Sequence, residues 1–105
     1  MIEITLRKSE TGIYNGFLVE GHAGFDEYGR DIVCAAVSAM VINTINSIEA
    51  FTEDAFEADM AEDGGRIEFK MVSDISKESE LLLNSLVLGL QGIETQYGNQ
   101  FIKLL

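Results

Sequence analysis

The stretch from Gly21 to Ser38 reads GHAGFDEYGRDIVCAAVS, and the rest of the chain is organised around it. It contains the only histidine of the protein, His22, and the only cysteine, Cys34. A short, polar, glycine-rich loop leads from the histidine into a long apolar run, and the cysteine lies at the start of that run. A thiol at a helix N-terminus with an imidazole one short loop away is the arrangement that a cysteine nucleophile needs.

The apolar run predicts a helix that ends near residues 49–51. Asp31 is a good N-cap candidate, which places Cys34 in the first helical turn. Asp31 lies three residues before Cys34 and Ser38 lies four residues after it, so we expect both to line a site centred on the sulfur. The apolar stripe of this helix has helical spacing and comprises Val33, Val37, Met40, Val41, Thr44, Ile45 and Ile48.

Strands are predicted on both sides of this stretch. Residues 2–7 alternate between apolar and polar side chains, as in a half-buried strand. Asn15-Gly16 is a hairpin-turn signal, because both residues tolerate positive φ. Residues 17–19 are then the partner strand, so His22 follows where that strand becomes a loop. The loop at 23–30 is either a mobile lid over the site or an ordinary connection.

A second hairpin and a second helix follow. Residues 56–60 and 67–71 alternate, and Glu62-Asp63-Gly64-Gly65 forms the turn between them. Ser76 caps the second helix, Gly98 ends it, and residues 100–105 form a last strand. Its buried stripe is Leu83, Leu86, Val87, Leu90 and Ile93. Two leucines outside that stripe either pack on a partner chain or cover the edge of the core; they are Leu82 and Leu88.

The element order is therefore β-β-α-β-β-α-β. Two hairpins with short turns favour a mainly antiparallel sheet with two helices packed on it, which is an α+β fold. A chain of 105 residues is expected to form one domain, 1–105.

Composition narrows the classes of function. The net charge is −11, which disfavours direct binding to nucleic acid and suits a basic partner. A single cysteine forms no internal disulfide and fits a reducing compartment. The alternating N-terminus lacks the apolar core of a signal peptide, and no apolar run approaches the ~20 residues of a membrane span. We expect a cytoplasmic protein that does not bind a membrane.

The electrostatics around the thiol are mixed. Free N–H groups and the helix dipole favour the thiolate of Cys34, and an imidazolium would favour it further. Asp31 acts in the opposite direction, since one anion disfavours another close by. Its carboxylate is a candidate to accept a hydrogen bond from His22 or to cap the helix, and both roles remain open.

Acyl transfer also requires hydrogen-bond donors for an oxyanion. The N–H groups of Cys34 and Ala35 are the first candidates, and the backbone from Gly21 to Gly24 is the second. One histidine and one cysteine are too few ligands for a zinc site, so we predict no metal and no other cofactor.

At these residues the sequence resembles the ribosomal-processing cysteine protease family, Prp. The resemblance covers nearly the whole chain, and the motifs that carry it around the cysteine are Gly21-His22-Ala23, Glu27-Tyr28-Gly29 and Asp31-Ile32-Val33-Cys34-Ala35, with Ser38. Further matches are Asp63-Gly64-Gly65 in the second turn and Leu90-Gln91, Ile93-Glu94 and Tyr97 in the last helix.

The resemblance implies a Cys–His dyad in which Cys34 is the nucleophile and His22 is the general base and later the acid. Asp31 and Ser38 match family positions near the site. It also implies the substrate, large-subunit ribosomal protein twenty-seven, whose short N-terminal extension, ending in an apolar, Phe-containing motif, the enzyme removes. The family is dimeric, which would place Leu82 and Leu88 at an interface.

Two other functions are compatible with the residues. One is a non-enzymatic acidic module that escorts a basic ribosomal protein, with Cys34 packed in the core. The other is a thiol-based redox sensor. Thiol reactivity separates them, because a core cysteine is inert and a sensor reacts without needing His22.

Overall fold

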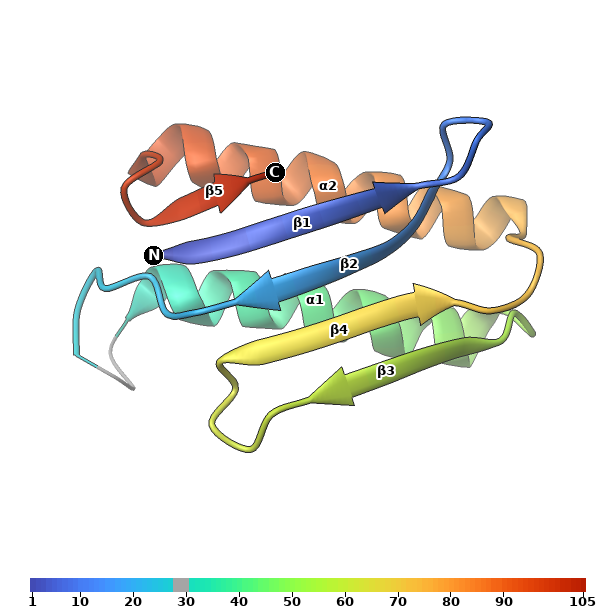
Figure 1. Cartoon of the computed structure of the whole chain (residues 1–105), viewed down its shortest axis with the longest axis horizontal. Coiled ribbons are helices and arrows are strands. Elements are labelled where there is room, and N and C mark those ends of the chain that lie inside the picture. The colour runs from blue at the N-terminus through green and yellow to red at the C-terminus, as the bar shows by residue number, and fades with distance from the viewer. Residues whose placement is uncertain (28–30) are drawn as a thin grey trace.

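Five strands form one sheet, and two helices cover one of its faces (Figure 1). We describe residues 1–27 and 31–105 in a computed structural model of the chain. The elements are β1 (Ile2–Lys8), β2 (Tyr14–Glu20), α1 (Ile32–Phe51), β3 (Phe56–Met60), β4 (Arg66–Met71), α2 (Lys77–Tyr97) and β5 (Ile102–Leu104). The strand order is β3-β4-β2-β1-β5, and only the β1–β5 pair is parallel. The predicted α+β class and element order are confirmed.

The first hairpin turn lies earlier than Asn15-Gly16, so that prediction was wrong. The chain turns at Ser9–Ile13, where Ser9 N–H donates to Ile13 O at 2.8 Å and Gly12 has a φ of 84°. Asn15 and Gly16 lie inside β2. A Cβ on Gly16 would lie 2.8 Å from the carbonyl oxygen of Phe69 on β4, so this glycine permits a close strand approach.

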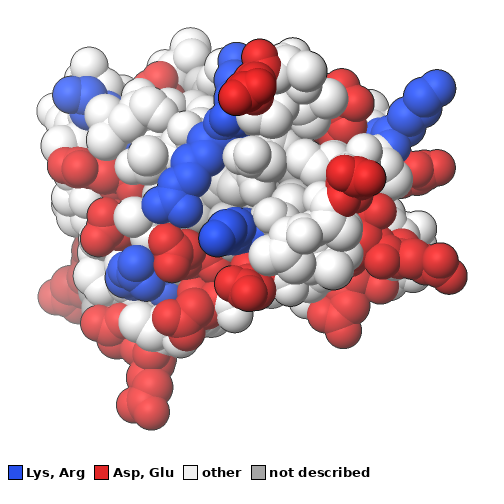
Figure 2. Space-filling model, turned by 45° about the vertical axis from the view of Figure 1, so that its right-hand side comes forward, with Lys and Arg blue, Asp and Glu red and all other residues white. Residues whose placement is uncertain are grey.

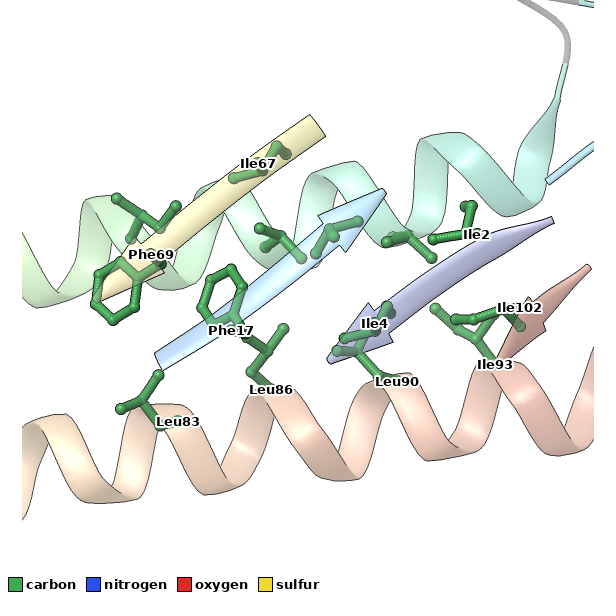
Figure 3. Packing of buried hydrophobic residues seen from close by; sticks show 14 of the residues in the cluster. Ile2, Ile4, Phe17, Ile67, Phe69, Leu83, Leu86, Leu90, Ile93 and Ile102 are labelled. Carbon is green, nitrogen blue, oxygen red and sulfur yellow. The ribbon is translucent and has the colours of Figure 1, made fainter. Parts of the chain in front are cut away.

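The core lies between the sheet and the two helices (Figure 3). Inward-facing residues of paired strands form cross-strand rows, since Ile4 is opposite Val19 and Phe17 is opposite Phe69. The rings of Phe17 and Phe69 stack with centroids 5.0 Å apart. Each such pair stabilises the register that fixes where β2 ends.

The predicted stripe of α1 is buried except at Met40, which is 36% exposed. α1 has 20 residues and a mean hydropathy of 1.5, so by length and composition it is able to cross a membrane. This differs from the expectation that no apolar run reaches that length. The apolar character follows from its place in the fold, because one side packs in the core and another meets α2.

Ser76 and Gly98 cap α2 as predicted. Leu82 is half-buried against the core, whereas Leu88 is 71% exposed. Leu81, two residues before the buried Leu83, is exposed and was not singled out by the sequence. The last strand is shorter than the predicted 100–105, because residues 99–101 form a turn before it.

Candidate active site

The end of β2 brings the histidine to the edge of the sheet. Gly21 has a φ of 89°, and a Cβ on it would lie 2.5 Å from the carbonyl oxygen of Met1. Its N–H donates to Gly65 O at 2.8 Å, directly before β4. Gly21 is therefore packed between Met1, next to β1, and Gly65, next to β4, and only a glycine fits there. The next residue, His22, leaves the sheet at this point.

Asp31 joins the loop to α1. Its Oδ1 accepts hydrogen bonds from the N–H groups of Val33 and Cys34, both at 3.0 Å. Its Oδ2 accepts from the N–H groups of Phe25 at 2.9 Å and Asp26 at 3.4 Å. Burial alone would raise the pKa of Asp31, but these backbone hydrogen bonds together hold it below its usual value. Asp31 is thus the N-cap of α1 and also a clamp on the loop.

The thiol of Cys34 is half-buried at the start of α1. Its Sγ accepts a hydrogen bond from Ala23 N–H at 3.1 Å. Burial raises the pKa of the thiol most, the bond from Ala23 lowers it, and the charge of Asp31 and a hydrogen bond with Asp31 raise it again. Together these effects place the pKa of Cys34 above its ordinary value. The free enzyme therefore favours the thiol, and a base has to remove its proton.

Two hollows meet at the cysteine and the histidine. The larger has a volume of about 430 Å³ and is lined by His22, Gly24, Asp26, Asp31, Cys34, Ala35 and Ser38. The smaller, about 120 Å³, lies toward the sheet and the β3–β4 turn, and it is lined by Gly21, Asp63 and apolar core residues. His22, Cys34 and Ser38 line both hollows. The six predicted site residues therefore all line one or both of these hollows, and they are Gly21, His22, Asp31, Cys34, Ala35 and Ser38.

The structure changes the assignment of the oxyanion donors. The N–H of Cys34 donates to Asp31 Oδ1, and the N–H of Ala35 donates to Asp31 O at 3.0 Å. Both first-choice groups are thus occupied within the helix cap. The second choice, the segment from Gly21 to Gly24, contributes Ala23 N–H, which points at the sulfur.

The side chain of Phe25 anchors the first part of the loop that follows His22. The ring of Phe25 makes edge contacts with Tyr97 and Phe101, at centroid distances of 5.6 and 5.2 Å. Sequence reasoning assigned no role to Phe25, and its partners lie near the C-terminus. The rest of the predicted lid, residues 28–30, and with it most of the Glu27-Tyr28-Gly29 motif, lies outside the described residues.

The β3–β4 turn also reaches the histidine. A Cβ on Gly65 would lie 3.2 Å from His22 Nε2 and 3.1 Å from Asp63 Oδ1. From the sequence, Asp63 and Gly65 were expected to form a turn, but no contact with His22 was predicted. No local signal would reveal the contact, because the pairing of β2 with β4 creates it.

The arrangement suits nucleophilic attack on a peptide carbonyl. A thiol, an imidazole and a backbone N–H surround one opening that is large enough for a side chain. Within residues 1–27 and 31–105, no three His, Cys, Asp or Glu side chains gather as metal ligands.

Comparison with known proteins gives a consistent result over the whole chain. The family model described as Cysteine protease Prp matches residues 1–103. The chain is 32% identical to the ribosomal processing cysteine protease Prp of Staphylococcus aureus over 104 residues, which cover 99% of this chain and 97% of the relative. It is 33% identical to the Bacillus subtilis protein of the same name over 101 residues, with coverages of 92% and 90%.

A solved structure has the same fold. The crystal structure of the ribosomal processing protease Prp from S. aureus in complex with a covalently linked product peptide superposes with a TM-score of 0.93. The two sequences are 32% identical, and the match covers 99% of this chain and 97% of the other.

Proposed function

Because the chain belongs to the cysteine protease Prp family and is a cysteine-type peptidase, we propose that Cys34 is its nucleophile and His22 its general base. The observation that carries this proposal is their position: both side chains line the two hollows that meet at the start of α1. Cys34 is also the only thiol in the chain, and His22 is the only imidazole.

In the first half of the reaction, His22 takes the thiol proton and Cys34 Sγ attacks the scissile carbonyl carbon. The C–S bond forms, and negative charge develops on the carbonyl oxygen. Ala23 N–H, which donates to the sulfur in the free enzyme, lies where it is able to stabilise this charge. The C–N bond then breaks, and the imidazolium returns its proton to the leaving amine.

In the second half, water hydrolyses the thioester. His22 removes a proton from the water, the new C–O bond forms, and the C–S bond breaks. The proton returns to the thiolate, which restores the neutral pair. The raised pKa of Cys34 fits this order, because the thiol keeps its proton until His22 removes it.

The proposed substrate is the short apolar N-terminal extension of large-subunit ribosomal protein twenty-seven, as the family resemblance implies. Relatives named ribosomal processing cysteine proteases support this choice. The net charge of −11 suits a basic partner, and acidic side chains spread over much of the face that Figure 2 shows. Ribosomal proteins are made in the cytoplasm, so we propose that this enzyme acts there.

A cleavage assay tests the dyad. Purified precursor of the ribosomal protein is incubated with the wild type, Cys34→Ala and His22→Ala, and the mature N-terminus is identified by mass spectrometry. We expect no cleavage by Cys34→Ala and a rate at least ~100-fold lower for His22→Ala, since general-base catalysis contributes 10²–10⁴-fold. Glu10→Ala, in the remote first turn, is the matched control.

Full cleavage by either variant would contradict the dyad. Binding of the precursor without cleavage by the wild type would instead support the escort function.

We also propose that the enzyme is a homodimer. Leu81 and Leu88 are 69% and 71% exposed, and they lie seven residues apart on the same side of α2. Large apolar side chains in such a row favour contact with a second apolar surface, and a second copy of α2 supplies one.

A further inference from the structure

An imidazole nitrogen and a carboxylate both lie beside Gly65. His22 Nε2 lies 3.2 Å from the position that a Cβ would take on this glycine. The Oδ1 and Oδ2 atoms of Asp63 lie 3.1 and 3.4 Å from the same position. Three polar atoms thus surround one point, and the absence of a side chain at residue 65 leaves room for them.

The backbone holds this group in place. Asp63 Oδ1 accepts a hydrogen bond from Gly65 N–H at 2.8 Å, which fixes the carboxylate over the turn. Gly65 O in turn accepts from the N–H of Gly21, the residue before His22. The carboxylate and the imidazole are therefore carried by two segments that are hydrogen-bonded directly to each other.

Asp31 was the sequence candidate for orienting the histidine, but its oxygens serve other partners. Four backbone N–H groups donate to them, two from α1 and two from the loop. It is also only 7% exposed. The carboxylate that approaches His22 Nε2 above Gly65 belongs to Asp63, about forty residues away in the sequence.

We propose that Asp63 is the positioning residue for His22, an inference that rests on the proposed function. Its carboxylate accepts the Nε2–H of the imidazole, which fixes the tautomer with Nδ1 unprotonated. Nδ1 then takes the proton of the Cys34 thiol. The imidazolium keeps its Nε2–H bonded to the carboxylate, so Asp63 stabilises the positive charge without accepting the proton.

This role has a specific effect on the pH profile. Among residues 1–27 and 31–105, the titratable groups that line the two hollows with His22 are Asp26, Asp31, Cys34 and Asp63. The general base acts only as the neutral imidazole, so kcat/KM falls on the acid side as that base becomes protonated. Removing the charge of Asp63 destabilises the imidazolium, and the acid limb therefore moves to lower pH.

The first test compares Asp63→Ala and Asp63→Asn with the wild type on a peptide spanning the cleavage site. The alanine variant lacks both the charge and the acceptor, and we expect kcat to fall at least tenfold with KM within twofold. Asparagine has a single amide oxygen, which Gly65 N–H occupies, so its NH2 group faces the imidazole and favours the tautomer with Nε2 unprotonated. We expect it to lose kcat at least as strongly as the alanine variant, with the acid limb of its remaining activity at lower pH. Glu62→Gln removes an adjacent carboxylate and is the matched control.

The second test crowds the imidazole and the carboxylate without replacing either. Gly65 does not have positive φ, so Gly65→Ala introduces no backbone strain, but its methyl group would lie 3.1 Å from Asp63 Oδ1 and 3.2 Å from His22 Nε2 and would push the two side chains apart. We expect kcat to fall at least fivefold with an unchanged melting temperature. Gly92→Ala in α2, where a Cβ meets nothing within 4 Å, is the control for adding a methyl group to a glycine.

The outcomes separate this inference from the proposed function. If the wild type cleaves the peptide and Asp63→Ala matches it in kcat and pH profile, the positioning role is wrong and the dyad stands. A folded Asp63→Ala that loses kcat while Asp63→Asn keeps the wild-type acid limb would also overturn the electrostatic part. If the wild type does not cleave the peptide, the proposed function itself fails. Should Asp63→Ala not fold, Gly65→Ala decides, and wild-type kcat there would refute the contact.

Discussion

At the scale of single residues, Asp31 answers a question that the sequence left open. It was a candidate both to cap α1 and to orient His22, and its hydrogen bonds to Val33, Cys34 and the loop show that it caps and clamps. The cap was predictable because it depends on residues two and three positions away. The loop clamp was not, because it depends on how residues 25 and 26 fold back over the helix start.

The Asp31 carboxylate is predicted to hold Cys34 in its protonated form. In Asp31→Asn the negative charge next to the sulfur is lost, so the pKa of Cys34 should fall and alkylation by iodoacetamide should begin at lower pH. The variant also loses an acceptor for two loop N–H groups, which we expect to cost about 1–2 kcal/mol of unfolding free energy. Asp26→Asn, which keeps the clamp intact, is the control, and an alkylation profile identical to that of the wild type would contradict the prediction.

At the scale of elements, helices were easier to locate than the first turn. Ser76 and Gly98 bound α2 through local chemistry that the sequence displays. Asn15-Gly16 has the same local appearance as a turn, but the register of β2 with β4 places Gly16 opposite Lys70. A glycine that permits a close approach between strands looks the same in sequence as one that permits a turn.

The start of α2 is also held by a residue outside the helix. Asp54, in the link between α1 and β3, accepts hydrogen bonds through Oδ2 from Ser76 N–H at 2.9 Å and from the hydroxyl groups of Ser76 and Ser79, both at 2.6 Å. The hydrogen bonds from the Ser76 side chain, the Ser79 side chain and the Ser76 backbone lower the pKa of Asp54. This carboxylate thus joins the ends of two elements that the sequence treats as separate.

We predict that Asp54→Ala lowers the unfolding free energy by about 2 kcal/mol, because hydrogen bonds to a charged acceptor are lost. In a domain of this size that corresponds to a melting temperature about 10 °C lower. The pKa is depressed in the folded state, so the stabilisation is present above the unfolded value of ~3.9 and is lost as the pH falls through the folded value. Thermal melts at pH 7 and below pH 3 should show the difference and its loss, with Glu53→Ala as control. If Asp54→Ala were less stable than the wild type by the same amount at every pH, the charge of Asp54 would not be the source of the stabilisation.

At the scale of the whole molecule, the site was only partly predictable. The spacing of one helix predicts that Asp31 and Ser38 lie on the same face as Cys34. The end of a strand predicts the position of His22. Asp63 and Gly65 reach the histidine because β4 pairs with β2 and not with β1. Sequence periodicity gives the number and type of strands, but their order in the sheet depends on packing between residues far apart in the chain.

The exposed leucines of α2, Leu81 and Leu88, lead to a prediction about assembly. Leu88→Asp should convert a dimer into a monomer at micromolar concentration, because a charge buried in an apolar interface without a partner is costly. Sedimentation equilibrium measures the mass directly. Val72→Asp, which alters a residue that is 50% exposed outside α2, is the control and should leave the mass unchanged. A Leu88→Asp protein that remains dimeric would mean that the interface lies elsewhere.

The parallel pairing of β5 with β1 has a consequence for the time course of synthesis. Ile2 pairs with Ile102, and Leu105 exchanges backbone hydrogen bonds with β1 through Ile4 and Leu6. Of the strands in this sheet, the first to be synthesised pairs with the last, so one edge of β1 stays open while the elements between them are made. The hairpins are able to form early, but the sheet that supports Gly21 and His22 is complete only once β5 has been synthesised. The nascent enzyme would then acquire its activity late, when β5 has paired.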